Sequence, residues 1–221
     1  MKIIAKIYTE FDEKFGIPRQ SGIINETIGK IVFEPEYRIP ESLRGIEGYS
    51  HLWLIWQFSE SIRDDWSPTV RPPRLGGNKR MGVFATRSPF RPNPIGLSSV
   101  RLLEVRKTEK DGLCLVVSGA DILSGTPIYD IKPYLAYTDS HPDAIGGFAD
   151  DVQNYSIEVE FCDGVSDKLS DDEIKKLEKV LAHDPRPSYK SDDCRSYGMK
   201  FNGKDISFKY EKSKLIVTNI K

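Results

Sequence analysis

The chain has 221 residues and a mass of 25.1 kDa, which suits a main domain with a small second unit. Hydrophobic residues make up 38% and charged residues 29%, a composition that excludes a wholly disordered chain. The formal net charge of −1 by itself indicates nothing about nucleic acid. No apolar run approaches the ~18 residues of a membrane-spanning helix. The N-terminus lacks the pattern of a signal peptide, so we expect a cytoplasmic protein.

The first part of the chain predicts short strands and almost no helix. The segments expected as strands are 3–8, 27–33, 51–58, 81–85, 97–106, 113–118 and 128–132. The nearly all-apolar segment 51–58 is typical of a strand buried on both faces. One helical turn is expected at 39–45, and Pro and Gly exclude regular structure from 66–80. A run of about eight short strands predicts a closed or nearly closed β-barrel.

The last part of the chain mixes helix and strand. Ser170 and Glu173 form a capping box, and the apolar residues after them repeat on one helical face, which predicts a helix to about residue 182. The strands expected here are 197–201, 205–210 and 215–220, the first two joined by a type I′ turn at Asn202-Gly203. The chain is therefore expected to be mainly β, with a β-barrel domain at 1–137, a linker and barrel-edge segment at 138–164, and a small C-terminal α+β domain at 165–221.

Basic residues concentrate in one segment rich in Pro and Gly. Residues 63–106 contain nine basic and three acidic residues, a net charge of +6, and eight of the nine are arginine. The planar guanidinium group suits phosphate and carboxylate. A solvated loop is the simpler interpretation, but arginines that alternate with Gly and Pro rather than Glu favour a positive field focused on an anionic ligand.

Familiar catalytic signatures are missing from the sequence. Residues 75–80 lack the second Gly and the Ser or Thr of a phosphate-binding loop, and no GxGxxG or GxSxG motif occurs. The three Cys and three His are dispersed without CxxC spacing, so neither a metal site nor a disulfide scaffold is expected. Residues 86–96, TRSPFRPNPIG, instead form a stiff path that would lose little entropy on binding a small anion or a nucleobase. A rigid crossover with solvated arginines is the alternative.

One long block and several short ones resemble a known family. Residues 69–96, TVRPPRLGGNKRMGVFATRSPFRPNPIG, are similar to the signature of the TrmO (TsaA-like, YaeB) family. Shorter matches are GIPRQ at 16–20, RGIEGYSHLW at 44–53, DILSGTP at 121–127, DIKPY at 130–134, and DPRP at 184–187 followed by Tyr189. The long block is specific, whereas each short match alone would be weak.

The resemblance implies an S-adenosylmethionine-dependent tRNA methyltransferase. Its expected substrate is the N6 of N6-threonylcarbamoyladenosine at position 37, next to the anticodon, and its expected partners are the tRNA anticodon stem-loop and a second copy of the chain. A non-catalytic RNA- or nucleotide-binding barrel of the same family is the alternative, and a methyltransferase for another small substrate is a third reading. No metal, membrane or DNA is expected.

The resemblance also implies the cofactor site. The residues expected to contact S-adenosylmethionine are Pro18, Arg19, Gln20, Ser59, Glu60, Arg87, Leu97, Asp121, Ile122, Leu123, Ser124, Gly125 and Thr126. The Ser59-Glu60 pair departs from the His-Gln that the family often has there. Arg19 or Arg87 is expected to bind the cofactor carboxylate, and Asp121 to accept from a ribose hydroxyl.

Methyl transfer from a sulfonium mainly requires donor and acceptor to be aligned and water to be excluded. The acceptor nitrogen is a poor nucleophile that must lose a proton, so a group that orients it is expected. Asn93, fixed between two prolines, is the first candidate, with Asp130 or Tyr134 as alternatives; Asn93 capping a turn is equally compatible with the pattern.

An anticodon loop offers phosphates to cations and unstacked bases to aromatic rings such as those of Trp66 and Phe90. The residues expected to contact RNA are Arg71, Arg74, Lys79, Arg80, Arg91, Arg186 and Tyr189.

Overall fold

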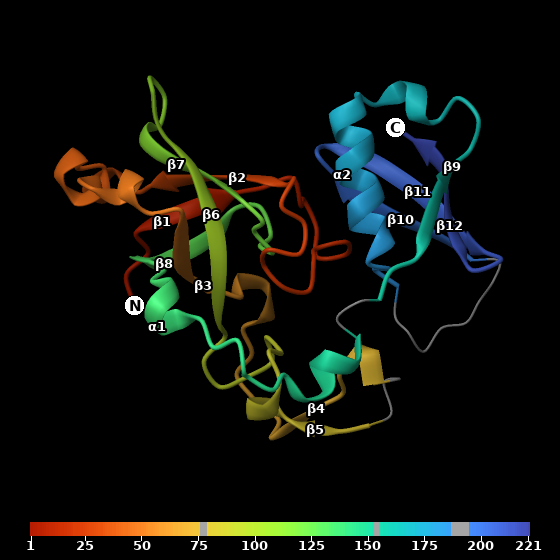
Figure 1. Ribbon diagram of the computed structural model, residues 1–221, viewed down its shortest axis with the longest axis horizontal. Coiled ribbons are helices and arrows are strands. Elements are labelled where there is room, and N and C mark those ends of the chain that lie inside the picture. The colour runs from red at the N-terminus through yellow and green to blue at the C-terminus, as the bar shows by residue number, and fades with distance from the viewer. Residues whose placement is uncertain (76–78, 153–154, 187–194) are drawn as a thin grey trace.

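The computed structural model describes residues 1–75, 79–152, 155–186 and 195–221, without the side chains of Arg74 and Val152. Six antiparallel strands close a barrel in the order β1-β2-β7-β6-β3-β8 (Figure 1). Their bounds are β1 Ala5–Tyr8, β2 Ile28–Phe33, β7 Gly112–Ser118, β6 Ile95–Thr108, β3 His51–Gln57 and β8 Thr126–Pro133. The predicted β-barrel is confirmed.

Buried and outward-facing residues alternate along the strands, and the buried ones form the barrel core. In β3, Leu52, Leu54 and Trp56 are buried, whereas the residues between them face outward and are partly or fully exposed. The prediction that 51–58 is buried on both faces was therefore wrong. A closed antiparallel barrel buries one face of each strand, and the outward apolar residues of β3 lie on its surface.

The insertion between β3 and β6 is mostly irregular. It contains a two-stranded ribbon of β4 Thr69–Val70 and β5 Met81–Gly82, so the predicted strand at 81–85 is cut short by a 3-10 turn, and part of 66–80 is regular after all. Within the described residues, the short 3-10 helices are Pro35–Tyr37, Pro40–Leu43, Ile46–Gly48, Ser59–Ser61, Pro73–Leu75, Val83–Ala85, Gly147–Val152 and Ser166–Lys168. A short helix, α1 Ala136–Asp139, follows β8.

The C-terminal unit packs one helix on a four-stranded sheet. The helix is α2 Asp171–Ala182, and the sheet order is β10-β11-β12-β9, with β10 Ser196–Phe201, β11 Lys204–Glu211, β12 Lys214–Ile220 and β9 Glu158–Phe161. Positive φ angles at Asn202 (49°) and Gly203 (72°) confirm the predicted hairpin turn, and the capping box of Ser170 and Glu173 is present. The sequence did not indicate β9, which pairs parallel to β12.

The barrel and the C-terminal unit each have a core of their own, and the β1–β2 loop contributes to the core of the C-terminal unit. The loop between β1 and β2 leaves the barrel and buries Phe11 and Ile24 among the apolar residues of the C-terminal unit (Figure 1). The ring of Phe15 stacks on those of Tyr197 and Phe208, with centroids 6.4 and 6.2 Å away. The loop that carries the GIPRQ motif is therefore held by the C-terminal sheet.

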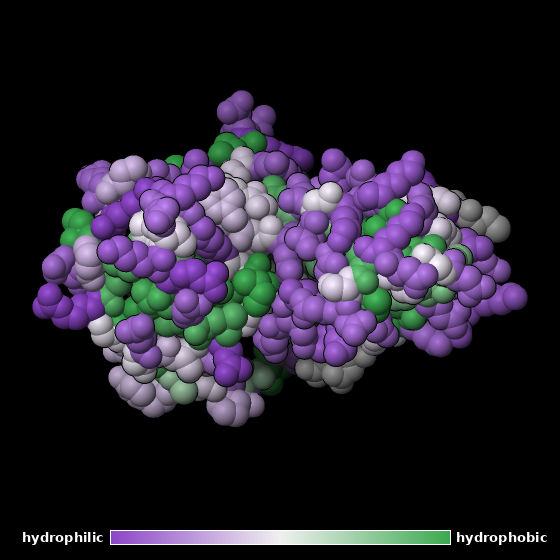
Figure 2. Space-filling model, turned by 90° about the horizontal axis from the view of Figure 1, so that it is seen from above, coloured by the Kyte–Doolittle hydropathy of each residue, from purple (hydrophilic) through white to green (hydrophobic). Residues whose placement is uncertain are grey.

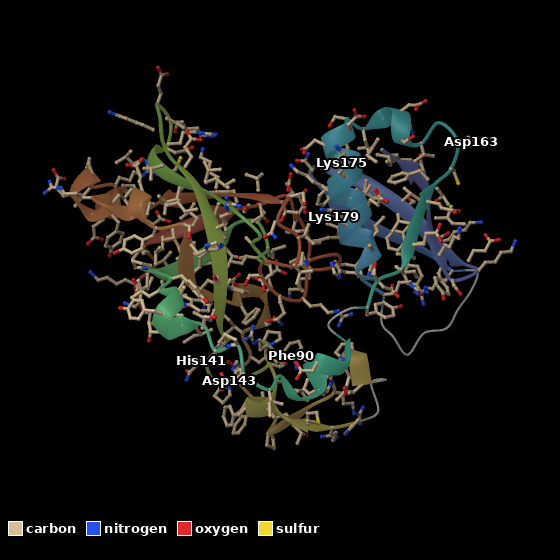
Figure 3. All side chains as sticks on the ribbon, viewed as in Figure 1. Phe90, His141, Asp143, Asp163, Lys175 and Lys179 are labelled. Carbon is tan, nitrogen blue, oxygen red and sulfur yellow. The ribbon has the colours of Figure 1, made fainter. Side chains whose placement is uncertain are left out.

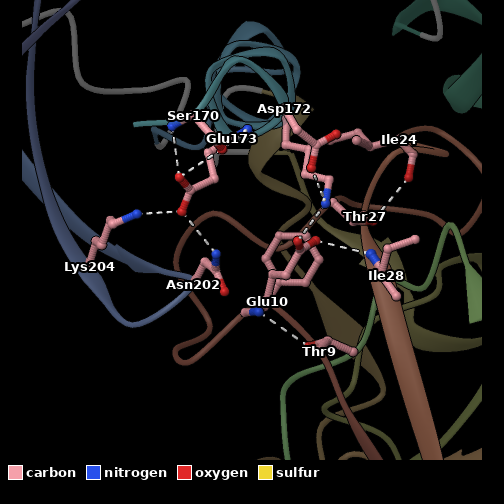
Figure 4. A network of polar contacts seen from close by, with 12 residues as sticks. Thr9, Glu10, Ile24, Thr27, Ile28, Ser170, Asp172, Glu173, Asn202 and Lys204 are labelled. Atoms are coloured by element: carbon pink, nitrogen blue, oxygen red, sulfur yellow. Dashed lines mark hydrogen bonds and ion pairs between the residues drawn. The ribbon is translucent and has the colours of Figure 1, made fainter. Parts of the chain in front are cut away.

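Ion pairs reinforce this seam (Figure 4). The Nζ of Lys176 on α2 lies 2.9 Å from Oε1 of Glu10, and both side chains are largely buried. The other carboxylate oxygen of Glu10 accepts from the backbone N–H of Ile28 at 3.0 Å, which ties helix α2 to the start of β2. No helix within the described ranges has the length and apolar character needed to span a bilayer.

Candidate functional site

Two loops at one end of the barrel are held in direct contact. The backbone N–H of Gly22 in the β1–β2 loop donates to the carbonyl of Gly119, just after β7, over 2.8 Å. A Cβ at Gly119 would lie 3.3 Å from the backbone of Gly22 and 3.1 Å from Oδ1 of Asn25, so the approach favours glycine. This contact brings Asp121 to the backbone of Ser21, the residue that follows the GIPRQ motif.

A third segment joins these two loops through Arg87. Its guanidinium group donates to Oε1 of Gln20, and its positive charge acts on Asp121. The Asp121 carboxylate also accepts a hydrogen bond from Oγ of Ser98, on β6, at 2.5 Å. We call the group formed by Gln20, Arg87, Ser98 and Asp121 the rim site. Three matched motifs that are far apart in the sequence therefore meet at one end of the barrel.

The electrostatics of the rim site centre on Asp121. Burial raises the pKa of Asp121 above its ordinary value, and the hydrogen bond from Ser98 and the charge of Arg87 oppose that rise. The site thus combines a guanidinium group with a carboxylate that is partly withdrawn from water. It can bind an anionic group and accept from a hydroxyl within one ligand.

Hydrogen bonds to the start of the chain fix the loop at 121–126. The hydroxyl of Thr9 donates to the carbonyl of Ile122 at 2.8 Å, and the N–H of Ser124 donates to the carbonyl of Phe11 at 2.9 Å. The side chains of Ile122 and Thr126 are buried, at 0% and 3% exposure. These two side chains pack inward, which leaves their backbone groups as the part that could contact a cofactor.

The side chains of Leu123 and Ser124 are partly buried, and Gly125 is exposed. In the GIPRQ motif, Pro18 is buried and Arg19 is exposed. Leu97, on the outer face of β6, is 57% exposed. It pairs with Ile55 across to β3, so its side chain lies outside the barrel.

Ser59 and Glu60 lie in a 3-10 turn directly after β3. The N–H of Phe58 donates to the carbonyl of Pro94 at 2.8 Å, which holds this turn against the stiff 86–96 segment. The Nζ of Lys14 donates to the carbonyl of Glu60 at 2.7 Å and lies 3.4 Å from its carboxylate. The pair that departs from the family pattern is thus bound to the loop that leads into GIPRQ.

The three catalytic candidates do not lie together. Asn93 is exposed, and its carbonyl accepts from the N–H of Ile95 at 2.7 Å, which closes a tight turn before β6. Asp130 is paired with Lys132 at 3.0 Å. Tyr134 follows the far end of β8, eight residues from Thr126, a span of about 26 Å in an extended strand. Within one protomer, the structure does not bring Tyr134 to the rim site.

The insertion presents cations and aromatic rings at the surface. Trp66 and Phe84 are 52% and 73% exposed, with ring centroids 6.1 Å apart. The Arg63 guanidinium lies 4.0 Å from the ring centroid of Phe90. Figure 3 shows that Phe90, in the insertion, lies well apart from the part of the C-terminal unit that carries Asp163. Among the predicted RNA contacts, Arg71, Lys79 and Arg80 are exposed and Arg91 is partly buried.

Arg186 was expected to contact RNA, and the structure places it elsewhere. It is 7% exposed, and its Nε and Nη2 donate to the two carboxylate oxygens of Asp184 at 2.8 Å each. Its guanidinium also stacks over Tyr210 at 3.6 Å. Such burial makes it a residue that holds the C-terminal unit together. Tyr189 and the side chain of Arg74 lie outside the described part of the chain.

Sequence reasoning missed three residues that shape the site. Ser98 and Trp56 are buried barrel residues, and Oγ of Ser21 accepts from the N–H of Ser99 at 3.1 Å. In the sequence each resembles any serine or tryptophan of a strand or loop.

Comparison with known proteins covers nearly the whole chain. The family model described as tRNA-methyltransferase O N-terminal domain matches residues 6–140, and the one described as TrmO C-terminal domain matches residues 154–221. An Escherichia coli protein named tRNA (adenine(37)-N6)-methyltransferase is 43% identical over 193 residues, which are 85% of this chain and 82% of that protein.

Two Pseudomonas aeruginosa comparisons agree with these matches. A protein named putative S-adenosylmethionine-dependent methyltransferase RcsF is 39% identical over 221 residues, 96% of this chain and 93% of that one. The crystal structure of TrmO from the same species superposes with a TM-score of 0.79 at 33% identity, covering 99% of this chain and 94% of that chain.

Proposed function

The chain belongs to the TrmO family of tRNA methyltransferases, and on this premise we propose that its rim site binds the methyl donor beside the anticodon loop of tRNA. The protein is an S-adenosylmethionine-dependent tRNA N6-methyltransferase that acts on adenine at position 37. The finer substrate is the threonylcarbamoyl form of that adenosine. The protein acts on this tRNA in the cytoplasm.

The contact between Arg87 and Gln20, with Asp121 beside it, carries the proposed donor site. The donor has a carboxylate, two ribose hydroxyls and a sulfonium. Arg87 has further N–H groups with which to bind the carboxylate, and exposed Arg19 is the second candidate for it. Asp121 accepts from a ribose hydroxyl. The backbone of 121–126 and the partly buried side chains of Leu123 and Ser124 close over the donor.

The neighbouring segments complete the donor pocket. Pro18 stiffens the start of the motif, and Ser59 and Glu60 border the pocket through the contact of Phe58 with Pro94. Leu97 offers an apolar surface at the start of β6. These groups position the donor and exclude water, which is most of what methyl transfer from a sulfonium requires.

The acceptor is positioned by Asn93. Asn93 is exposed next to the turn that the Pro94 contact holds. Its amide oxygen accepts from the N6 hydrogen of the adenosine and orients the nitrogen lone pair toward the methyl group. Asp130 is occupied by Lys132, and Tyr134 lies at the other end of β8. Within one protomer, these positions favour Asn93 as the group that touches the acceptor.

The insertion provides the proposed tRNA surface. Arg71, Lys79, Arg80 and Arg91 offer cations for anticodon-loop phosphates, and Trp66, Phe84 and Phe90 offer exposed rings for unstacked bases. In the chain, this surface lies between Ser59 and Asn93. The tRNA would therefore bind next to the donor pocket.

The protein is also proposed to act as a homodimer. Tyr137 and Ile145, eight residues apart in the chain, are 86% and 92% exposed. The face seen in Figure 2 also carries hydrophobic residues on the barrel half, among hydrophilic ones. Contiguous exposed apolar surface is typical of an interface. Light scattering at micromolar concentration should give twice the chain mass; a monomer would contradict the dimer.

The test of the reaction uses tRNA from cells that lack this enzyme. Incubation with S-adenosylmethionine, followed by nucleoside mass spectrometry, should convert the threonylcarbamoyl nucleoside to a product heavier by one CH₂. If the mass gain appears on unmodified adenosine instead, the methyltransferase activity stands and the threonylcarbamoyl substrate is overturned.

A further inference from the structure

A chain of two hydrogen bonds runs from the barrel core to the rim site. The indole Nε1 of Trp56 donates to Oγ of Ser98 at 2.9 Å, and that hydroxyl donates to Oδ1 of Asp121 at 2.5 Å. Trp56 and Ser98 are 5% and 1% exposed, so solvent does not compete for either bond. None of the functional motifs in the sequence includes Trp56 or Ser98.

The direction of these two hydrogen bonds follows from which groups can donate. An indole N–H can only donate, so Ser98 must accept from it. The serine hydroxyl has a single proton, and that proton is then directed to the carboxylate of Asp121. Trp56 is itself immobilised: its ring meets Phe58 edge-on at 4.3 Å, and a Cβ at Gly96 would collide with it. The core therefore decides which way the Ser98 hydroxyl points.

We propose that Ser98, oriented by Trp56, is a positioning residue that holds Oδ1 of Asp121 and leaves Oδ2 to accept from the ribose of S-adenosylmethionine. The inference rests on the proposed function, in which Asp121 binds the donor. It adds a device within the barrel core that sets both the orientation and the charge of that carboxylate.

The charge of Asp121 depends on a balance of groups from several elements. Burial raises its pKa, the hydrogen bond from Ser98 on β6 lowers it, and the charge of Arg87 from the 86–96 segment lowers it further. The backbone of Ser21, from the β1–β2 loop, also stabilises the charged form. Without the Ser98 hydroxyl, the carboxyl group would take up a proton at higher pH and lose its fixed orientation.

The experiment measures the Kd for S-adenosylmethionine by calorimetry as a function of pH. The Ser98→Ala variant is expected to raise the Kd about tenfold, the size of one hydrogen bond to a charged group. The acid limb of its binding profile should move to higher pH. Ser98→Thr, which keeps the hydroxyl, should restore the wild-type profile. Ser118→Ala is the matched control, because it removes a hydroxyl from another buried barrel serine, 3% exposed.

The outcomes separate this inference from the donor site itself. Asp121→Asn is measured alongside. If Asp121→Asn weakens binding while Ser98→Ala keeps both the Kd and the pH profile of the wild type, the positioning role is overturned and the donor site stands. If Asp121→Asn binds like the wild type, the donor placement fails, and this inference fails with it. Equal losses in Ser98→Ala and Ser118→Ala would also overturn it, since they would reflect general loosening of the barrel.

Discussion

The guanidinium group of Arg87 donates to the amide oxygen of Gln20, although 67 residues separate them in the chain. This bond connects the stiff loop that enters β6 to the loop that the C-terminal unit holds. Asp121 faces the same pair from a third loop. The rim site therefore joins the segment that enters β6 to a loop that packs on the C-terminal unit.

Arg87→Ala should weaken S-adenosylmethionine binding by about ten- to a hundredfold, because it removes the charge for the donor carboxylate and the bond that orders Gln20. Gln20→Ala should lose less, since it removes only a neutral partner. Calorimetry on the two variants and on Lys107→Gln, an exposed cation near the far end of β6, makes the comparison. Equal affinity in Arg87→Ala and wild type would exclude Arg87 from the donor site.

Gly16→Ala should lower both stability and donor affinity. Gly16 has a φ of 97° and its Cβ would collide with the side chain of Met199 on β10, so the substitution adds strain where the β1–β2 loop meets the C-terminal sheet. Gly45→Ala is the matched control, with a φ of 87° and open space around the new Cβ, in a segment outside the β1–β2 loop. Thermal unfolding should show a loss of about 1–2 kcal/mol in the control and more in Gly16→Ala. The donor Kd should rise more in Gly16→Ala. Identical effects would show that the loop does not depend on the sheet.

Glu173→Gln should destabilise the protein in a pH-dependent way. The hydrogen bonds from Lys204 and from the backbone of Ser170 lower the pKa of Glu173 from 4.5 to about 2. Because the folded-state pKa is depressed, its stabilisation is complete above 4.5 and disappears as the pH falls toward about 2. The difference in unfolding free energy from wild type should be about 1 kcal/mol near neutral pH, since a partly exposed pair is screened by water. This difference in unfolding free energy should vanish as the pH falls to about 2. A difference that is constant with pH would contradict the assignment to charge.

Asn93→Ala should lower kcat about ten- to a hundredfold at saturating donor and tRNA while the donor Kd stays the same. The reason is that Asn93 is proposed to orient the acceptor nitrogen and not the donor. Asn93→Asp keeps a side-chain oxygen at the same place and should retain more activity. Full turnover in Asn93→Ala would leave Asn93 as a turn residue only.

Two surface variants should separate phosphate contacts from base stacking. Arg71→Gln should reduce the slope of log affinity for tRNA against log salt concentration by about one. Trp66→Ala should weaken binding about tenfold or more with little change in that slope, because stacking releases no counterions. Filter binding between low and moderate salt measures both. A flat salt dependence of the wild-type protein would contradict a phosphate-binding insertion.

The barrel and the C-terminal unit could be predicted because their signals are local. Alternating apolar residues mark most strands, and Ser170 with Glu173 marks the helix start. The four residues of β9 were missed because their partner, β12, lies more than fifty residues away and runs parallel. Phe11 and Ile24 are recognisable as core residues, but nothing local tells to which core they belong.

The site residues that lie in the matched motifs could be predicted from the sequence, whereas the residues that support them could not. A basic residue between two prolines, Arg186, was taken for an RNA contact, because its stacking on Tyr210 depends on a strand that follows it in the sequence. Ser98, in contrast, was missed, because a buried hydroxyl in a strand has no sequence signal that it faces a carboxylate. Side chains that act through long-range contacts need the folded chain.

The most direct test of the account is a crystal structure of the protein with S-adenosylmethionine. The account predicts the donor at the rim site, with its carboxylate within hydrogen-bond distance of Arg87 or Arg19 and a ribose hydroxyl on Asp121. A donor bound elsewhere, for example in the apolar groove lined by Tyr37, Ile55 and Tyr129 on the outer face of the barrel, with the rim site empty, would contradict it.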